Sequence, residues 1–420
     1  MLDRQMPDYY TDPSLVDDPH PFFDQIRSRG PVVYLQDRNV AAITGYEEAV
    51  AVYNDTEHFS SIVAVTGPLP ALPFEPEGDD ITAQIEEYRD RIPFGREVAA
   101  LPAPEHTRLR SLLNPLFTPA RLRAMDPGFR RVADQLIDEF NCDGRVEFVG
   151  FYANPLATLI ITELLGIPQS DRPIFRNYFD GGTVAGVGAS TEEIAHNPLI
   201  EIGTRIAGYI VERRQVPGSD ILSGFATAVY PDGSVPTVEE AARVASFLFG
   251  AGQDTTTKLL GTSLRIISER PHLQQMLRDH PEHIPDFIEE VLRYDGSIKA
   301  SHRLCQRSTT IGGVDIPAGT VVLISNLAAN RDARRFDDPD KFEINRPRRK
   351  EHLAFGRGTH TCAGAALART EVRITLEHLL RRFATITVDE DMHGPLGNRR
   401  YRYEQSYVLR GLEELHLILT

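Results

Sequence analysis

The sequence predicts a mainly helical protein with small β-sheets at one side. Apolar residues recur at spacings of three and four over long stretches, which is the period of a helix buried along one face. Runs rich in β-branched residues are short and end at turn signals. No glycine- and serine-rich linker or internal repeat divides the 420 residues. We therefore expect one domain over residues 1–420, with a helix-rich body and a smaller β-rich N-terminal side.

The candidate elements follow along the chain. Strands are predicted at residues 31–37, 41–45 and 309–324, with a turn over the IPAGT segment at 316–320. The periodic stretches predict helices at 121–140, 200–214, 239–269 and 365–383. Residues 60–104 are rich in proline and acidic side chains, and we interpret them as an irregular loop that is a functional lid or partly mobile.

Composition excludes several classes of protein. A formal net charge of −15 disfavours nucleic acid as a partner, because phosphate recognition needs a basic surface. Cys142, Cys305 and Cys362 are odd in number and widely separated, so we predict no disulfide framework and a reducing compartment, the cytoplasm. No apolar run is long enough for a membrane span, and the first residues lack a secretory profile, so we expect no membrane anchor.

The segment FGRGTHTCAG, residues 355–364, carries the first chemical signal. Cys362 lies just before a predicted helix, where the helix dipole and free N–H groups stabilise a thiolate that suits a metal ion. Gly356 and Gly358 let the backbone turn sharply beside a flat partner, and Phe355 can shield the sulfur. Taken alone, such a cysteine is more often a small buried apolar residue.

Three further patterns accompany this loop. Small residues at 250–252 interrupt a long apolar helix before Asp254 and three threonines, although a simple packing face is the alternative interpretation. Glu290 and Arg293 are one helical turn apart, which by itself is a common salt bridge. Cationic side chains lie in separate segments at His106, Arg110 and Arg303, where each taken singly is more often a surface charge or a cap.

The pattern F-G-x-G-x-H-x-C-x-G resembles the haem-binding signature of the cytochrome P-450 family at every fixed position. The resemblance implies the fold of that family, with haem b between a long oxygen-binding helix and the helix after the cysteine loop, and Cys362 as the axial thiolate on iron. It implies that cationic side chains serve the haem propionates. The implied cofactor-binding residues are His106, Arg110, Ala251, Arg303, Phe355, Gly356, His360, Cys362 and Gly364.

The same resemblance assigns the other patterns. Asp254 would supply protons to bound dioxygen and Thr255 would position them, beside a local distortion of the helix. Thr256 and Thr257 leave this alignment ambiguous by a residue. A buried structural triad would join Glu290 and Arg293 to Arg346.

The resemblance therefore predicts a haem-thiolate monooxygenase that hydroxylates or epoxidises a hydrophobic small molecule, such as a terpenoid, a steroid or a fatty acid. Electrons from NAD(P)H would arrive through a ferredoxin reductase and an iron–sulfur ferredoxin. Two alternatives are a peroxide-driven or rearranging haem-thiolate enzyme, which the pair of Asp254 and Thr255 disfavours, and a haem-binding sensor, for which no output module is apparent. Expected substrate-lining residues are Phe247, Leu248, Ile298 and Ala300, and expected docking residues are Arg121, Arg123, Arg348, Arg349 and Lys350.

Overall fold

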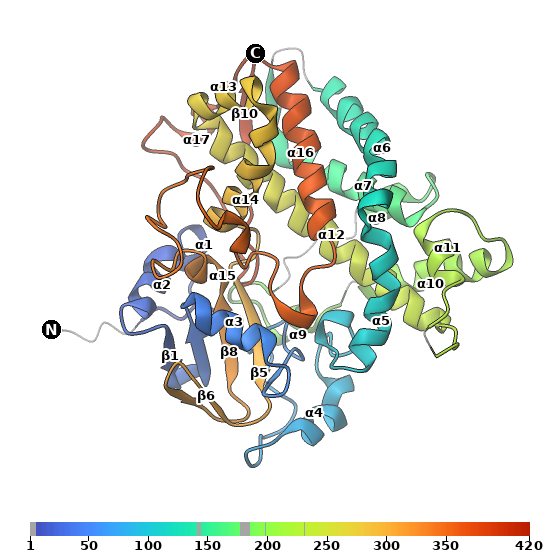
Figure 1. Cartoon of the computed structure of the whole chain (residues 1–420), viewed down its shortest axis with the longest axis vertical. Coiled ribbons are helices and arrows are strands. Elements are labelled where there is room, and N and C mark those ends of the chain that lie inside the picture. Colours follow the sequence, from blue (N-terminus) through green and yellow to red (C-terminus); the bar gives the residue numbers. More distant parts are fainter. Residues whose placement is uncertain (1–5, 141–143, 177–184, 198, 231) are drawn as a thin grey trace.

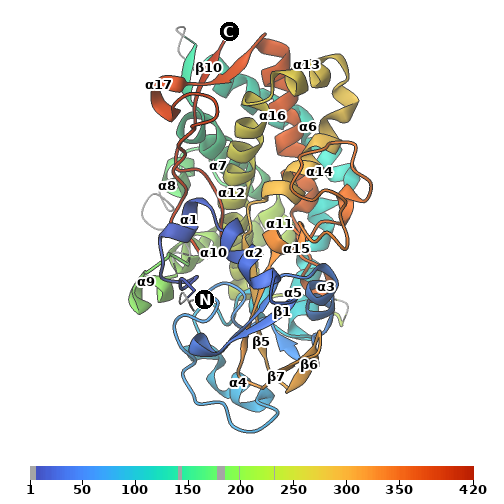
Figure 2. The ribbon, with the colours of Figure 1, turned by 90° about the vertical axis from the view of Figure 1, so that its left-hand side faces the viewer.

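The computed structural model describes residues 6–140, 144–176, 185–197, 199–230 and 232–420, so Cys142 lies outside the described residues. Helices make up the body. Strands β1, β5 and β6 lie at its lower end in both views, whereas β10 lies near the top (Figures 1 and 2). The longer helices are α2 (His20–Arg27), α3 (Tyr46–Asn54), α5 (Glu105–Leu113), α6 (Pro119–Asp138), α7 (Asn154–Leu165), α10 (Leu199–Gln215), α12 (Val238–Ser268), α13 (Pro271–Asp279), α14 (Ile284–Asp295) and α16 (Ala365–Arg382). The shorter ones are α1 (Ser14–Asp17), α4 (Thr82–Tyr88), α8 (Arg172–Arg176), α9 (Thr191–Ala195), α11 (Ile221–Ala226), α15 (Asn326–Ala329) and α17 (Glu390–His393).

The described strands form three sheets. The largest has the order β1-β2-β8-β5-β3, in which β2 and β8 run parallel and the other neighbours run antiparallel. Its members are β1 (Val32–Leu35), β2 (Val40–Ile43), β3 (Phe59–Ser60), β5 (Ala300–Cys305) and β8 (Val321–Ser325). The second has the order β4-β10-β9, and the third is a hairpin of β6 and β7. Their members are β4 (Arg145–Glu147), β9 (Ile386–Val388), β10 (His416–Leu419), β6 (Thr309–Ile311) and β7 (Val314–Ile316).

The central strands of the large sheet are buried on both faces. Ala41 and Ile43 of β2 pack with α3, while Val40 and Ala42 pack on the opposite face with α2. Side chains alternate between the two faces of a strand, so both sets must be apolar when both faces are covered. This is why β2 and β8 are apolar at nearly every position. The structure confirms the predicted strands at 31–37, 41–45 and 309–324 as β1, β2 and the segment from β6 to β8.

The longest helix, α12, confirms the periodicity seen at residues 239–269. Thr237 caps its first turn, accepting a hydrogen bond from the N–H of Glu240 at 3.0 Å, while the Glu240 carboxylate accepts from the N–H of Thr237 at 2.8 Å. This reciprocal arrangement satisfies two amides that a helix start otherwise leaves unpaired. The helix runs without interruption from Val238 to Ser268, and no 3-10 or π turn divides it near Ala251.

Residues 60–104 are less irregular than the sequence predicts. They contain α4, and Arg89, directly after that helix, is almost fully buried. Its guanidinium donates to the carbonyl oxygens of Gly95 at 2.8 Å and Ala100 at 3.2 Å. One buried cation thus organises much of a segment whose composition is typical of a loop.

None of the helices in the described part of the chain combines the length and the apolar character needed to cross a bilayer.

Candidate functional site

A cavity lies between the middle of α12 and the start of α16. It contains about 840 Å³ of space that no atom fills, part of it open to solvent. Seven of the nine predicted cofactor-binding residues line it: His106, Arg110, Ala251, Phe355, His360, Cys362 and Gly364. Segments far apart in the sequence, α5, α12 and the loop before α16, therefore converge on one space.

Cys362 lines this cavity, three residues before the first residue of α16. Burial raises the pKa of its thiol, while the N–H groups of Gly364 and Ala365 and the charges of Arg110 and Arg369 oppose that rise. The N-terminus of α16 thus supplies the hydrogen bonds that a thiolate accepts. A cation bound at the sulfur would favour the ionised form further.

The two glycines of the loop shape its backbone as the sequence predicts. Gly356 and Gly358 have φ values of +66° and +70°, in the left-handed region that favours glycine. A Cβ atom on Gly358 would lie 2.5 Å from the carbonyl oxygen of Tyr53. Gly356 itself does not line the cavity, so its part in the site is to turn the chain.

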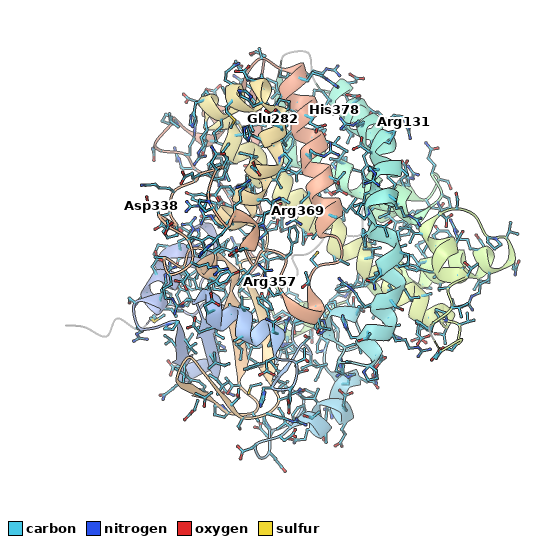
Figure 3. The ribbon with its side chains drawn as sticks, in the orientation of Figure 1. Arg131, Glu282, Asp338, Arg357, Arg369 and His378 are labelled. Carbon is cyan, nitrogen blue, oxygen red and sulfur yellow. The ribbon has the colours of Figure 1, made fainter. Side chains whose placement is uncertain are left out.

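The Phe355 ring is held from its other side by Arg369 of α16, whose guanidinium carbon lies 4.5 Å from the ring centroid. Arg369 also donates from Nη2 to Glu289 Oε2 at 3.0 Å, and Figure 3 shows it at the lower end of α16. A cation over an aromatic face stabilises the ring position. Phe355 is therefore fixed as one side of the cavity.

Four side chains that can carry positive charge belong to the site, and they are His106, Arg110, Arg303 and His360. The rings of His106 and His360 lie 4.0 Å apart, and neither Nδ1 atom has a hydrogen-bond partner. Burial lowers the pKa of His106 to about 4 and that of His360 to about 3, and Arg110 lowers both further. Arg303 of β5 adds to the effect on His360, although it does not itself line the cavity.

These cationic side chains can be compared with the charge that a haem would carry. The groups that shift the pKa values of His106, His360 and Arg303 include no carboxylate among the described residues. Buried cations and unpaired buried nitrogens are costly without an anionic partner. A planar ligand with two carboxylates on one edge and a metal ion near Cys362 would satisfy both, so the residues present fit the group.

One face of α12 forms the opposite wall. The lining residues from this helix recur at the spacing of one helical stripe, and they are Phe247, Leu248, Ala251, Gly252, Thr255 and Thr256. Thr255 donates its hydroxyl to the carbonyl oxygen of Ala251 at 2.7 Å. Two predicted substrate-lining residues, Ile298 and Ala300, lie outside this lining, and their prediction is not supported.

Asp254, the predicted proton source, lies outside the cavity lining. Its carboxylate forms an ion pair with Lys258 one turn along α12. Lys258 is almost fully buried and also pairs with Glu404 Oε2 at 2.8 Å. The stripe that faces the cavity includes residues 251 and 255, so residue 254 projects to another side of the helix. Delivery of protons by Asp254 would require this pair to open.

A buried acid that the sequence analysis did not single out contacts a residue of the cavity lining. Glu371 of α16 forms a hydrogen bond with Thr256, and its Oε2 has no partner. Burial raises its pKa to about 8, against the effect of that hydrogen bond. The signal in the sequence was an acid four residues after Leu367, inside the apolar stripe of the helix.

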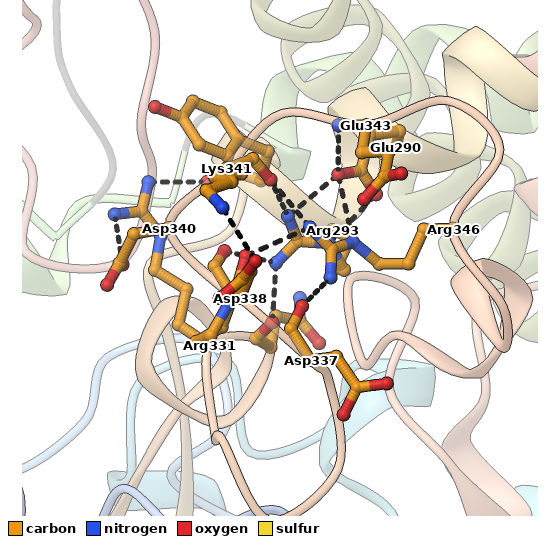
Figure 4. A network of polar contacts seen from close by, with 12 residues as sticks. Glu290, Arg293, Arg331, Asp337, Asp338, Asp340, Lys341, Glu343 and Arg346 are labelled. Atoms are coloured by element: carbon orange, nitrogen blue, oxygen red, sulfur yellow. Dashed lines mark hydrogen bonds and ion pairs between the residues drawn. The ribbon is translucent and has the colours of Figure 1, made fainter.

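Glu290, Arg293 and Arg346 are brought together in a buried network (Figure 4). Glu290 accepts from Arg293 Nε and Nη2, both at 2.8 Å, and from Arg346 Nε at 3.2 Å. The two guanidinium groups also donate to backbone carbonyls, among them that of Lys341 at 3.0 and 2.7 Å. The network joins α14 to the segment that leads to the cysteine loop.

Comparisons with known proteins agree with this geometry. The family model described as Cytochrome P450 matches residues 211–399. Two relatives from Saccharopolyspora erythraea are 6-deoxyerythronolide B hydroxylase, 30% identical with 94% of each chain covered, and Cytochrome P450 107B1, 34% identical with 74% of each covered. The substrate-free structure of CYP150A6 from Mycobacterium marinum is 48% identical, covers 99% of this chain and 98% of its own, and has a TM-score of 0.92. With its mainly helical fold and its cysteine loop, the chain belongs to the cytochrome P450 family of haem-thiolate monooxygenases.

Proposed function

We propose that residues 1–420 act as one catalytic domain, in which Cys362 binds the haem iron and a hydrophobic small molecule is hydroxylated or epoxidised beside α12. The observation that carries this proposal is the position of the Cys362 thiol at the N-terminus of α16, facing the cavity beneath Thr255 and Ala251. When bound, the haem supplies the activation of dioxygen. The protein supplies the axial sulfur, the fixed orientation of the cofactor and the protons.

His106, Arg110, Arg303 and His360 would hold the two propionates. Burial, followed by the neighbouring cationic groups, lowers the pKa values of His106 and His360, and the Nδ1 atoms of both histidines have no hydrogen-bond partner. Both observations support this assignment. Charge-assisted hydrogen bonds to a carboxylate are stronger than neutral ones, so four such donors fix one edge of the cofactor.

Thr255 would hold a proton at its hydroxyl next to bound dioxygen. Its side chain lines the cavity, and its bond to the Ala251 carbonyl fixes the hydroxyl position. Asp254 would act as the proton source only in a state where its ion pair with Lys258 has opened. A positioned hydroxyl that exchanges with water contributes to general acid catalysis.

The substrate would be an apolar molecule of the terpenoid, steroid or fatty-acid kind. Apolar side chains from four segments line the cavity, and they are Val98, Leu113, Ile161, Phe247 and Leu248. A lining of this composition binds chiefly by removing apolar surface from water. The hydroxylase of S. erythraea named above is a relative that acts on a small organic molecule, as its name states.

Electrons would come from NAD(P)H through a ferredoxin reductase and an iron–sulfur ferredoxin in the cytoplasm. The exposed residues Arg123, Arg348 and Lys350 support docking of an acidic partner near the cysteine loop. Arg349 is less suited to this role, because its Nε already donates to Asp286 at 2.9 Å.

The test is the absorption spectrum of the dithionite-reduced protein under carbon monoxide. We expect a strongly red-shifted Soret band for the wild type, because a thiolate donates electron density to the iron. Cys362→Ser should lose that band, while Cys305→Ser, which changes a buried cysteine of β5, should retain it. An unchanged band in Cys362→Ser would overturn the ligand assignment.

A further inference from the structure

A groove lies on the other side of one wall of the haem cavity. It is formed by residues 89–97, by α10 and by the first turns of α12, and it contains about 1540 Å³ of unfilled space, including space open to solvent. Consecutive residues separate it from the cavity. Glu97 and Ser246 line the groove, whereas the next residues along the chain, Val98 and Phe247, line the cavity. The two spaces therefore share a thin wall.

The wall is rigidly built around Glu97. Arg89 donates to the carbonyl oxygens of Gly95 and Ala100, on either side of Glu97 in the chain. The N–H of Ala100 also donates to the Glu97 carbonyl at 2.8 Å. A Cβ atom on Gly95 would lie 2.5 Å from the Arg89 carbonyl oxygen, so the backbone is closely packed here. The position of the Glu97 side chain is thus set by its supports.

The carboxyl group of Glu97 is buried and incompletely satisfied. The residue is 7% exposed, its Oε1 accepts from Asn197 Nδ2 at 3.4 Å, and its Oε2 has no hydrogen-bond partner. Burial raises its pKa to about 7. A buried acceptor without a donor is destabilising, and a bound molecule that donates a hydrogen bond would remove this cost.

The cations of the groove do not supply that donor. Arg243 Nη2 donates to Glu239 Oε1 at 3.2 Å, and Arg96 Nε donates to Asp90 Oδ1 at 2.6 Å. Both arginines line the groove, and each is already paired with a carboxylate that also lines it, so their charges largely cancel. Burying a charged donor beside Glu97 costs more free energy than burying a neutral one, so a neutral donor is favoured over an ammonium group.

Apolar side chains complete the groove. Phe94 and Leu199 are at least partly buried, and Ile200 is 70% exposed. A molecule lying here would cover Ile200 while its polar end reached Glu97. Its remaining length would point along the wall that the groove shares with the haem cavity.

We propose that this groove binds the polar end of an apolar molecule that carries a hydroxyl group, with Glu97 accepting the hydrogen bond. The inference goes beyond the proposed function, since the wall separates this groove from the haem cavity and makes it a second binding site. Glu97 is on this view the residue that sets the specificity of the groove. It distinguishes a hydroxyl group from an oxygen that cannot donate.

The experiment compares two isomers, 1-decanol and methyl nonyl ether, by isothermal titration calorimetry on the haem-loaded wild-type protein. They have the same atoms, but only the alcohol donates a hydrogen bond. We expect the alcohol to bind about tenfold more tightly, as one hydrogen bond to a carboxyl group implies. In Glu97→Leu the two isomers should bind with equal affinity. Glu97→Met, which also lacks an acceptor oxygen, serves if the leucine variant does not fold.

Thr204→Val is the matched control. Thr204 lines the same groove, but its hydroxyl donates to the Ile200 carbonyl at 3.0 Å, so its loss should leave the tenfold preference unchanged. Equal affinities in the wild type, or a preference that persists in both Glu97 variants, would overturn the inference. The carbon monoxide spectrum of each variant separates this outcome from failure of the proposed function, because it reports the thiolate and not the groove.

Discussion

Lys258 holds Asp254 in an ion pair one turn along α12, on a side of the helix that does not face the haem cavity. The lysine is almost fully buried and is shared with Glu404, which comes from the C-terminal segment. Gly411 packs closely against the Lys258 side chain, since a Cβ atom at residue 411 would lie 2.2 Å from Lys258 Cγ. The acid next to Thr255 is therefore tied to the C-terminal part of the chain.

Lys258→Met should destabilise the fold. The substitution leaves the Asp254 and Glu404 carboxylates together without their cation, and breaking a buried pair in this way costs roughly 3 kcal/mol. The free energy of unfolding in urea measures the loss. Arg402→Met is the control, because its pair with Glu414 is on the surface and should contribute less than about 1 kcal/mol. Equal effects of the two substitutions would contradict the buried role.

Thr255→Ala should uncouple electron consumption from substrate oxidation. Loss of a hydroxyl that holds a proton at the cavity is expected to increase hydrogen peroxide released per NAD(P)H consumed severalfold. Thr256→Ala is the matched comparison, because Thr256 also lines the cavity but is hydrogen-bonded to Glu371. A larger peroxide yield from Thr256→Ala would move the positioning role to that residue.

Glu371 should make the stability of the protein depend on pH. The pKa of its carboxyl group is about 8 in the folded protein, against an ordinary value of 4.5. Folding therefore takes up a proton at pH values between these two. This contribution to stability is complete below pH 4.5 and is lost as the pH rises through about 8. Glu371→Gln removes it.

The measurement is the urea midpoint of wild type and Glu371→Gln across this pH range. The stability of the variant relative to the wild type should increase as the pH rises, because only the wild type must deprotonate a buried acid. Glu390→Gln, an exposed acid in α17, should show a constant difference from the wild type. A constant difference for Glu371→Gln as well would show that this acid is already ionised in the folded protein.

The regular elements were predictable from local patterns, and the site was predictable only in part. The capping residues Thr237 and Glu240 and the apolar period of α12 are local signals, so that helix was predicted to within a residue or two. The cysteine loop was also local. Asp254 pairs with Lys258 at a local i, i+4 spacing. By contrast, the second partner of Lys258 is Glu404, which lies 146 residues further along the chain, and no local pattern announces that contact.

Two other differences between the sequence-based predictions and the structure also arise from contacts between distant parts of the chain. The segment at 60–104 was predicted as irregular because the bonds that organise it run from one buried side chain, Arg89, to backbone carbonyls. Ile298 and Ala300 were predicted to line the cavity, but the backbone of this segment pairs with the C-terminal chain instead, as the bridge between Ile298 and Leu409 shows. Tertiary contacts decided both outcomes.

Glu290→Ala should give protein that is poor in haem. Glu290 is the shared acceptor for Arg293 and Arg346, and its loss leaves two buried guanidinium groups without a counter-charge, which costs about 3–5 kcal/mol. The network supports the chain that leads to the cysteine loop, so the loop should lose its fixed geometry (Figure 4). The haem-to-protein ratio after purification measures this effect, with Glu282→Ala, an exposed acid in the turn before α14, as the control. Full haem occupancy in Glu290→Ala would mean that the cysteine loop holds its shape without the network.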